Sequence, residues 1–192
     1  LKADLAIGAY NTEIITASSS GAVNKTVTCS GSVTEPLLAA WETNGISGAI
    51  ASYTATTSDS NINTPVLSRG SGLNAAGLGN AFSSSNYSGT TLSEAITHNH
   101  FLQLVISPVE GKKVSLSRID ANFRRSSTGP NTFIWQYSLD GFTTSGVNIG
   151  SSFSYTGTEN NGLSQTPITL SEISALQNVN HGSSITLRLY GW

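Results

Sequence analysis

SITLRLYGW, residues Ser184–Trp192, is the stretch that decides the fold of this chain. Apolar Ile185, Leu187 and Leu189 alternate with polar residues, and a period of two is typical of a β-strand that is buried on one face. No turn and no further strand follow it in the sequence. We therefore predict that this strand is an open edge of a sheet, with Ile185, Leu187, Leu189 and Trp192 forming an acceptor edge for another chain.

Short strands are predicted throughout the rest of the sequence. Phe101–Ile106 is apolar on both faces, which predicts a strand in the middle of a sheet. Phe133–Leu139 alternates cleanly and leads into an Asp-Gly turn. The apolar positions change from even to odd numbers near Ser117–Arg118, which predicts a β-bulge or two short strands. Helical signals are limited to single turns at Leu92–Ile96 and at Ser171–Leu176, the second capped by its first serine.

These segments predict the fold class and the domain organisation. Many short strands, turn-forming residues between them and very little helix favour an all-β protein. We expect a jelly-roll β-sandwich over residues 36–192, preceded by a strand-forming extension over residues 1–35. A chain of 192 residues with 38% apolar residues and 3 tryptophans suits one such domain with a modest core.

The composition is typical of a secreted β-protein. Charged residues make up 10% of the chain, against about a quarter in an average globular domain. A net charge of −2 argues against a nucleic-acid partner, and no apolar run is long enough to predict a membrane span. Cys29 has no internal disulfide partner, so we interpret it as a small buried thiol, with an intermolecular bridge as the alternative.

The chain contains no methionine. We therefore expect a mature bacterial protein, secreted or held at the cell surface after removal of an export signal. A chain trimmed from a longer protein is the alternative explanation.

The first 35 residues have a pattern of their own. A second odd-numbered apolar series, from Val23 to Val33, follows a Ser-Ser-Ser-Gly break, so two strands are predicted here. The first is a candidate donor strand, whose apolar side chains would fill pockets on a neighbouring molecule or on its own domain by β-strand addition. Its inserted side chains would be Leu1, Ala3, Leu5, Ile7 and Ala9.

Four later stretches carry a resemblance to a known family. They are Leu67–Leu73 (LSRGSGL), Arg124–Pro130 (RRSSTGP), Tyr137–Phe142 (YSLDGF) and Arg188–Trp192 (RLYGW). Together they resemble a domain of exported bacterial proteins that often carry PEP-CTERM or type IX sorting tails. The resemblance implies a jelly-roll sandwich and export, without a defined activity. Members usually continue into one more strand after the last stretch, so the resemblance also implies that the N-terminal extension replaces that strand.

Polar residues offer two further candidate sites. His98 and His100 would lie on the same face of a strand, and with Glu94 they are candidate metal ligands, but a fourth ligand is lacking and we expect no metal site. Arg124–Arg125 and Asp140 could bind an acidic glycan. An ion pair that joins two turns is the more economical interpretation, because a guanidinium matches a carboxylate geometrically.

Aromatic residues offer a possible sugar platform. Trp135 and Tyr137 alternate within a predicted strand, which places them in the core, whereas Tyr87 and Tyr155 lie in polar segments and are the candidate carbohydrate contacts. No nucleophile elbow, metalloprotease motif or paired carboxylate is present, so we expect neither an enzyme nor a cofactor.

The leading functional hypothesis is an extracellular structural protein. Identical subunits would polymerise into a filament or surface layer by donating their N-terminal strands, because a head-to-tail contact that does not close generates fibres. The alternative is a carbohydrate-binding module of a secreted protein, with polysaccharide as its partner.

Overall fold

The computed structural model describes residues 8–17, 25–33, 37–158 and 161–192. It contains two compact units, Leu1–Leu37 and Leu38–Trp192, and each is considered by itself below. The division lies two residues from the boundary that the sequence predicts. In the described part of the chain, no helix is long and apolar enough to cross a membrane.

The first unit contains an antiparallel hairpin of β1 (Gly8–Ala17) and β2 (Lys25–Val33). The register shifts between Tyr10 and Glu13, where β1 carries one more residue than β2. Such a bulge bends the strand that contains it. Among the described strands, β1 and β2 pair only with each other.

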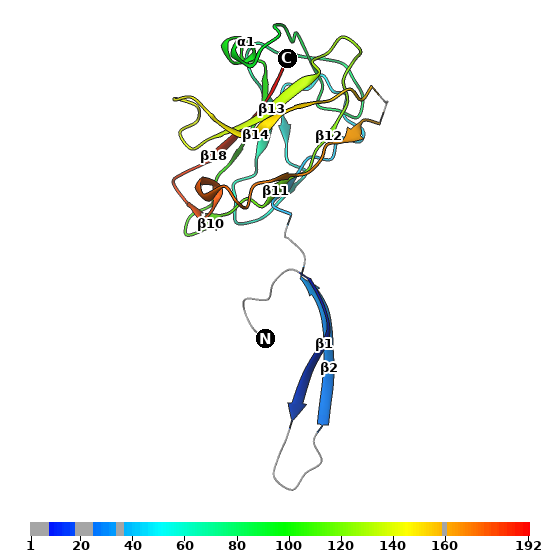
Figure 1. Cartoon of the computed structure of the whole chain (residues 1–192), viewed down its shortest axis with the longest axis vertical. Coiled ribbons are helices and arrows are strands. Elements are labelled where there is room, and N and C mark those ends of the chain that lie inside the picture. Colours follow the sequence, from blue (N-terminus) through cyan, green and yellow to red (C-terminus); the bar gives the residue numbers. More distant parts are fainter. Residues whose placement is uncertain (1–7, 18–24, 34–36, 159–160) are drawn as a thin grey trace. The chain divides into compact units, whose positions relative to one another are not determined.

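The second unit is built on one six-stranded sheet, in which all neighbouring strands are antiparallel. Figure 1 shows β13, β14 and β18 side by side in this unit, with α1 at one end. The prediction that Phe101–Ile106 is an interior strand is confirmed. In spatial order the strands are β14 (Val147–Ser154), β13 (Thr132–Ser138), β18 (Ile185–Gly191), β9 (Phe101–Ile106), β6 (Val66–Arg69) and β4 (Tyr53–Thr54).

Two antiparallel segments, residues 113–123 and 163–180, pair in three short ladders, and we call them the ribbon. It contains the two short strands predicted around Ser117–Arg118, since β10 ends before Ser117 and β11 begins at Arg118. Between its first and second ladders, the Gln177 amide donates to the carbonyls of Leu116 (2.9 Å) and Leu170 (3.0 Å). The ladders are β10 (Lys113–Val114) with β17 (Val179–Asn180), β11 (Arg118–Ile119) with β16 (Ile168–Thr169), and β12 (Asn122–Phe123) with β15 (Leu163–Ser164).

The main core lies between the six-stranded sheet and the ribbon. Alternate side chains of the sheet, such as Trp135, Leu187 and Leu189, pack in one cluster with Leu170 and Leu176 of the ribbon segments. The opposite face of the sheet carries a smaller cluster of Ala95, Phe101, Ile134 and Tyr190. The all-β class is thus confirmed, while the strand order alone does not establish a jelly-roll topology.

Helix is confined to two short segments in the described residues. α1 (Leu92–Thr97) matches the predicted turn, and Thr91 and Glu94 form a capping box at its start. The 3₁₀ turn η1 (Ser174–Leu176) is shorter than predicted. Its N-cap is Ile173, which makes no side-chain capping bond, so the prediction of Ser171 as the cap is wrong.

Two small ladders complete the unit. They are β3 (Ala39–Ala40) with β5 (Thr57–Ser58), and β7 (Asn74–Ala75) with β8 (Ser84–Ser85). The side chain of Arg69 joins the loops around them, because it hydrogen-bonds to Ile50, Ser83 and Ser84. This arginine is therefore structural.

Candidate functional site

The predicted acceptor edge does not exist, because β18 lies inside the sheet. It pairs with β13 along one side and with β9 along the other. Ile185, Leu187 and Leu189 are 0%, 3% and 4% exposed and belong to the main core. The alternation of the sequence identified a face that is buried, but it carries no information about strands from distant parts of the chain that fill both edges.

Trp192 is also hydrogen-bonded to the neighbouring strand segment. It is half-buried, its N–H donates to the Thr132 carbonyl (3.0 Å), and its own carbonyl accepts from Asn131 and Thr132. These bonds extend the pairing of β18 with β13 past the last residue of β18. Trp192 therefore continues the pairing with β13 and is not part of an acceptor edge.

The outer strands of the sheet are β14 and β4. β14 is eight residues long, but its register against β13 shifts between the partners of Phe133 and Trp135, and Gly150 there has φ +67°. Bulges of this kind interrupt the row of outward N–H and C=O groups and protect an edge from further pairing. β4 has only two residues. Neither edge of the large sheet offers a long continuous ladder.

The predicted donor strand lies only partly in the described chain. Leu1, Ala3, Leu5 and Ile7 fall outside the described residues, and Ala9 lies in β1 opposite Ser32. The described hairpin instead offers the outer side of β2, whose nine residues contain no inserted residue. The donor-strand prediction for the first nine residues therefore stays a prediction.

Tyr155, one of the two candidate sugar contacts, is a core residue. Only 9% of it is exposed, its hydroxyl hydrogen-bonds to the Phe123 carbonyl, and it accepts a bond from the Leu163 N–H (2.8 Å). Its ring meets that of Phe123 edge-on. The prediction is wrong because three separate segments fold around a tyrosine that lies in a polar stretch of sequence.

Tyr87, the other candidate, is half-buried beside His100, with ring centroids 6.1 Å apart. Burial of its phenol raises the pKa of Tyr87 to about 12. The ring therefore does not form an open platform for a sugar. Trp135 and Tyr137, by contrast, lie in the main core as predicted.

The two histidines do not share a strand face. His98 caps the end of α1, Asn99 turns the backbone with φ +57°, and His100 precedes β9 with 2% exposure. The His100 Nδ1 accepts a hydrogen bond from the Ser88 N–H (3.4 Å). Burial lowers the pKa of His100. No group of three or more His, Cys, Asp or Glu residues in the described chain is placed to hold a metal ion.

The predicted ion pair between the paired arginines and Asp140 is also wrong. The Arg125 guanidinium donates to the carbonyls of Gly129 (2.6 Å) and Pro130 (2.9 Å) and so closes its own loop. Asp140 accepts bonds from the hydroxyls of Ser138 (2.5 Å) and Thr144 (2.6 Å), and these bonds hold the pKa of its carboxyl well below its usual range. Each turn is braced locally, without a cross-link.

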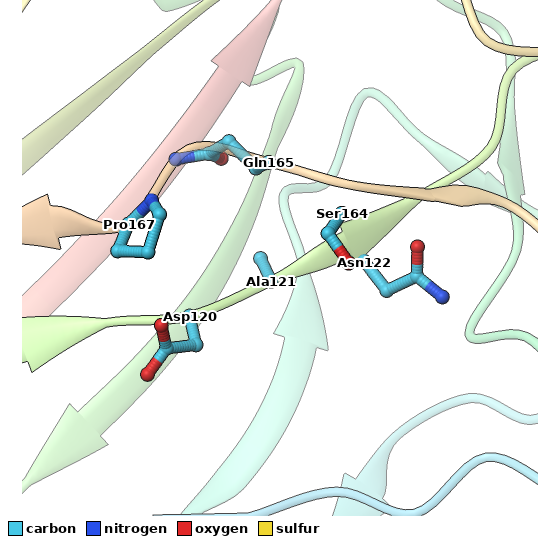
Figure 2. Close-up of a pocket in the computed structure, with 6 residues that line it drawn as sticks. All are labelled: Asp120, Ala121, Asn122, Ser164, Gln165 and Pro167. Atoms are coloured by element: carbon cyan, nitrogen blue, oxygen red, sulfur yellow. The ribbon is translucent and has the colours of Figure 1, made fainter.

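A shallow pocket of about 430 Å³ lies on the ribbon, where its β11 and β12 ladders separate. Figure 2 shows its lining side chains projecting from the two antiparallel segments. The Asp120 carboxylate is paired with Arg118 (2.8 Å), and the Gln165 amide oxygen accepts from the Trp135 indole (3.4 Å). The pocket is lined by Asp120, Ala121, Asn122, Ser164, Gln165 and Pro167. Because these polar groups are engaged, the pocket lacks a converging set of free ligands.

A different site was missed by the sequence. On the sheet face opposite the ribbon, the half-buried Arg188 guanidinium lies 3.9 Å from the ring centroid of Phe101 and 4.0 Å from that of Phe142. Its Nε donates to the Gln103 side-chain oxygen (2.7 Å), and its Nη1 donates to the Tyr190 hydroxyl (3.2 Å). A cation between two aromatic faces is held in one plane.

Phe142 reaches this position through an unusual backbone conformation. Its φ is +64°, a region that bulky residues rarely adopt. The Phe142 N–H donates to the Ser138 hydroxyl (2.8 Å), and the Asp140 carboxylate accepts the N–H groups of Thr143 and Thr144. The surrounding loop thus holds a strained residue in place. The Asp-Gly turn before Phe142 was visible in the sequence, but its contact with Arg188 depends on the register of β18 against β13.

Comparisons with known protein families, with curated proteins and with solved structures found no match to this chain. The chemistry of the site and the arrangement of the strands therefore carry the functional argument.

Proposed function

We propose that this protein is an exported structural subunit that self-associates by β-strand addition through its N-terminal hairpin. The observation that carries the proposal is that β1 and β2, ten and nine residues long, pair only with each other among the described strands. A two-stranded hairpin is at best marginally stable in water, and a third strand is normally needed. Strand addition from a second copy supplies that strand and its main-chain hydrogen bonds.

The edge that best supports such pairing is the outer side of β2. β1 carries the bulge near Tyr10, which bends a strand and interrupts its ladder, whereas β2 is continuous from Lys25 to Val33. Two copies of β2 can pair antiparallel about a two-fold axis. Association through β2 gives a pair of subunits, because the bulge in β1 disfavours pairing along its outer side.

The remaining parts of the proposal rest on the sequence. Export to the cell exterior and a jelly-roll arrangement of residues 38–192 follow from the four motifs that resemble domains of exported bacterial proteins. The all-β structure and the low charge of the chain are consistent with both. The alternative of a carbohydrate-binding module loses one of its two candidate sugar contacts, because Tyr155 is in the core.

Cys29 gives this proposal a sharp test. It is the middle residue of β2, so the register that pairs all nine residues places Cys29 of one copy opposite Cys29 of the other. Directly opposed residues of antiparallel strands have Cα atoms about 4.5–5.5 Å apart, within the range that a disulfide spans. Mild oxidation of the full chain should therefore give a covalent dimer, and a Cys29→Ser variant, which keeps the hairpin, should give none.

A second test of the proposal compares the sedimentation of the full chain with that of a chain lacking residues 1–36. The shorter chain retains the complete core of residues 38–192 and should sediment as a monomer, while the full chain should self-associate as its concentration rises. Equal sedimentation of the two chains as monomers would overturn the proposal. A full-chain dimer that does not cross-link through Cys29 would overturn the β2 register.

A further inference from the structure

A row of polar side chains crosses the six-stranded sheet on the face opposite the ribbon. Directly opposed residues of antiparallel strands lie on the same face, so the register places the row on five consecutive strands. Two side-chain bonds run along it, from Gln136 Nε2 to Asn148 Oδ1 (2.7 Å) and from Arg188 Nε to Gln103 Oε1 (2.7 Å). The row consists of Asn148, Gln136, Arg188, Gln103 and Ser68.

Arg188 differs from three other arginines of the same unit. Arg69 donates to backbone carbonyls through both Nη groups and to the Ser84 hydroxyl through Nε. Arg125 donates to backbone carbonyls through Nε and Nη2, and Arg118 is paired with Asp120. Arg188 has no carboxylate partner among the described residues, and its Nη2 makes no hydrogen bond to them. Arg188 is therefore a fixed cation whose Nη2 N–H groups remain available to a ligand.

The groups beside Arg188 also present donors. A guanidinium can only donate, so the Gln103 side chain must turn its oxygen toward Arg188, which leaves its Nε2 amide as a free donor. Asn148 is exposed, and its oxygen is occupied by Gln136. With the Gln103 and Asn148 side-chain oxygens occupied, the donors that remain around Arg188 favour an oxygen-rich anion.

We infer that this row binds the carboxylate groups of an acidic polysaccharide. Adjacent strands are about 4.8 Å apart, a spacing close to the length of one sugar ring. A sugar chain laid across the strands would meet donors from Gln103 and Arg188 on neighbouring strands, and from Asn148 beyond the buried Gln136. The planar Arg188 fork matches a carboxylate. The strained Phe142 fits this role, because strained backbone is held at binding sites by the surrounding structure.

Binding is measured by titration calorimetry of the full chain with short oligogalacturonates at low salt. The matched ligand is the fully methyl-esterified oligomer, which has the same sugar rings without charge, and dextran sulfate reports on charge attraction alone. The acidic oligomer should bind, the ester should not bind, and binding should weaken as salt is added.

Arg188→Gln should weaken binding of the acidic oligomer by about tenfold or more, the factor expected for loss of a charge-assisted hydrogen bond. Arg118→Gln removes the same charge from an exposed site on the ribbon and should leave binding unchanged. Asn148→Asp adds a carboxylate at an exposed position of the row, so it tests the site if Arg188→Gln fails to fold, and it should also weaken binding.

Three results would overturn the inference. They are no binding of the acidic oligomer at low salt, equal effects of Arg188→Gln and Arg118→Gln, and dextran sulfate binding that matches the oligogalacturonate in affinity and in its response to all three variants. The last result would show attraction to any polyanion. All residues of the row belong to the second unit, so dimerisation of the same samples through Cys29 reports separately on the proposed assembly.

Discussion

The packing of β18 against the main core can be tested by removing one of its core side chains. Leu187 is 3% exposed and lies in the main core, with β9 and β13 on either side. Leu187→Ala should lower the free energy of unfolding by about 2–5 kcal/mol, because the buried methyl groups are lost and a cavity remains. For a domain of this size, 1 kcal/mol corresponds to a change in Tm of about 2–4 °C, so a loss of about 3 kcal/mol should lower Tm by roughly 6–12 °C.

Urea unfolding followed by tryptophan fluorescence measures this change, since Trp135 belongs to the same cluster. The matched control is Val147→Ala in β14 of the same sheet, where the side chain is 52% exposed and the cost should stay below about 0.5 kcal/mol. If Leu187→Ala costs no more than Val147→Ala, then the Leu187 face of β18 is not packed in the main core.

Two further predictions concern the region between α1 and β9. The pKa of His100 is lowered by burial, so the unfolded state binds more protons as the pH falls through the ordinary histidine pKa near 6.5. Thermal stability should therefore be constant above neutral pH and decline below about pH 6.5. A His100→Gln variant should show a smaller decline, and identical Tm profiles for the two proteins would contradict this reasoning. A Cβ on Gly72 would lie 1.8 Å from the His98 carbonyl oxygen, whereas nothing lies within 4 Å of one on Gly77. Gly72→Ala should thus cost several degrees of Tm in a scanning calorimetry experiment and Gly77→Ala almost none, and a stable Gly72→Ala protein would show that His98 does not approach so closely.

The sequence predicted elements that depend on local pattern. Phe101–Ile106 and the alternating residues from Phe133 were recognisable because period and apolarity are properties of neighbouring residues. The short helical turn at Leu92–Ile96 was also predicted, and the break near Ser117 was recognisable from the change of face. These are the parts of the fold in which the local signal and the tertiary environment agree.

The candidate sites could not be predicted to the same extent, because they depend on which distant strands become neighbours. An alternating strand has the same sequence whether its edges are open or paired, so β18 was assigned to an edge that β9 and β13 fill. Tyr155 lies in a polar stretch but hydrogen-bonds to a strand more than thirty residues before it, as the separation of 32 from Phe123 shows. Arg188 acquires its role only when Gln103 and Phe142 are placed beside it.

The place of β18 in the sheet also determines when the domain can fold during its synthesis. β9 and β13 are not neighbours in the sheet, because β18 separates them and hydrogen-bonds to both. Until residues 185–191 have left the ribosome, the two strands lack the partner that joins them, and much of the main core has no surface to pack against. Folding that depends on such distant pairings is slow. The nascent domain thus stays unfolded until β18 has been synthesised.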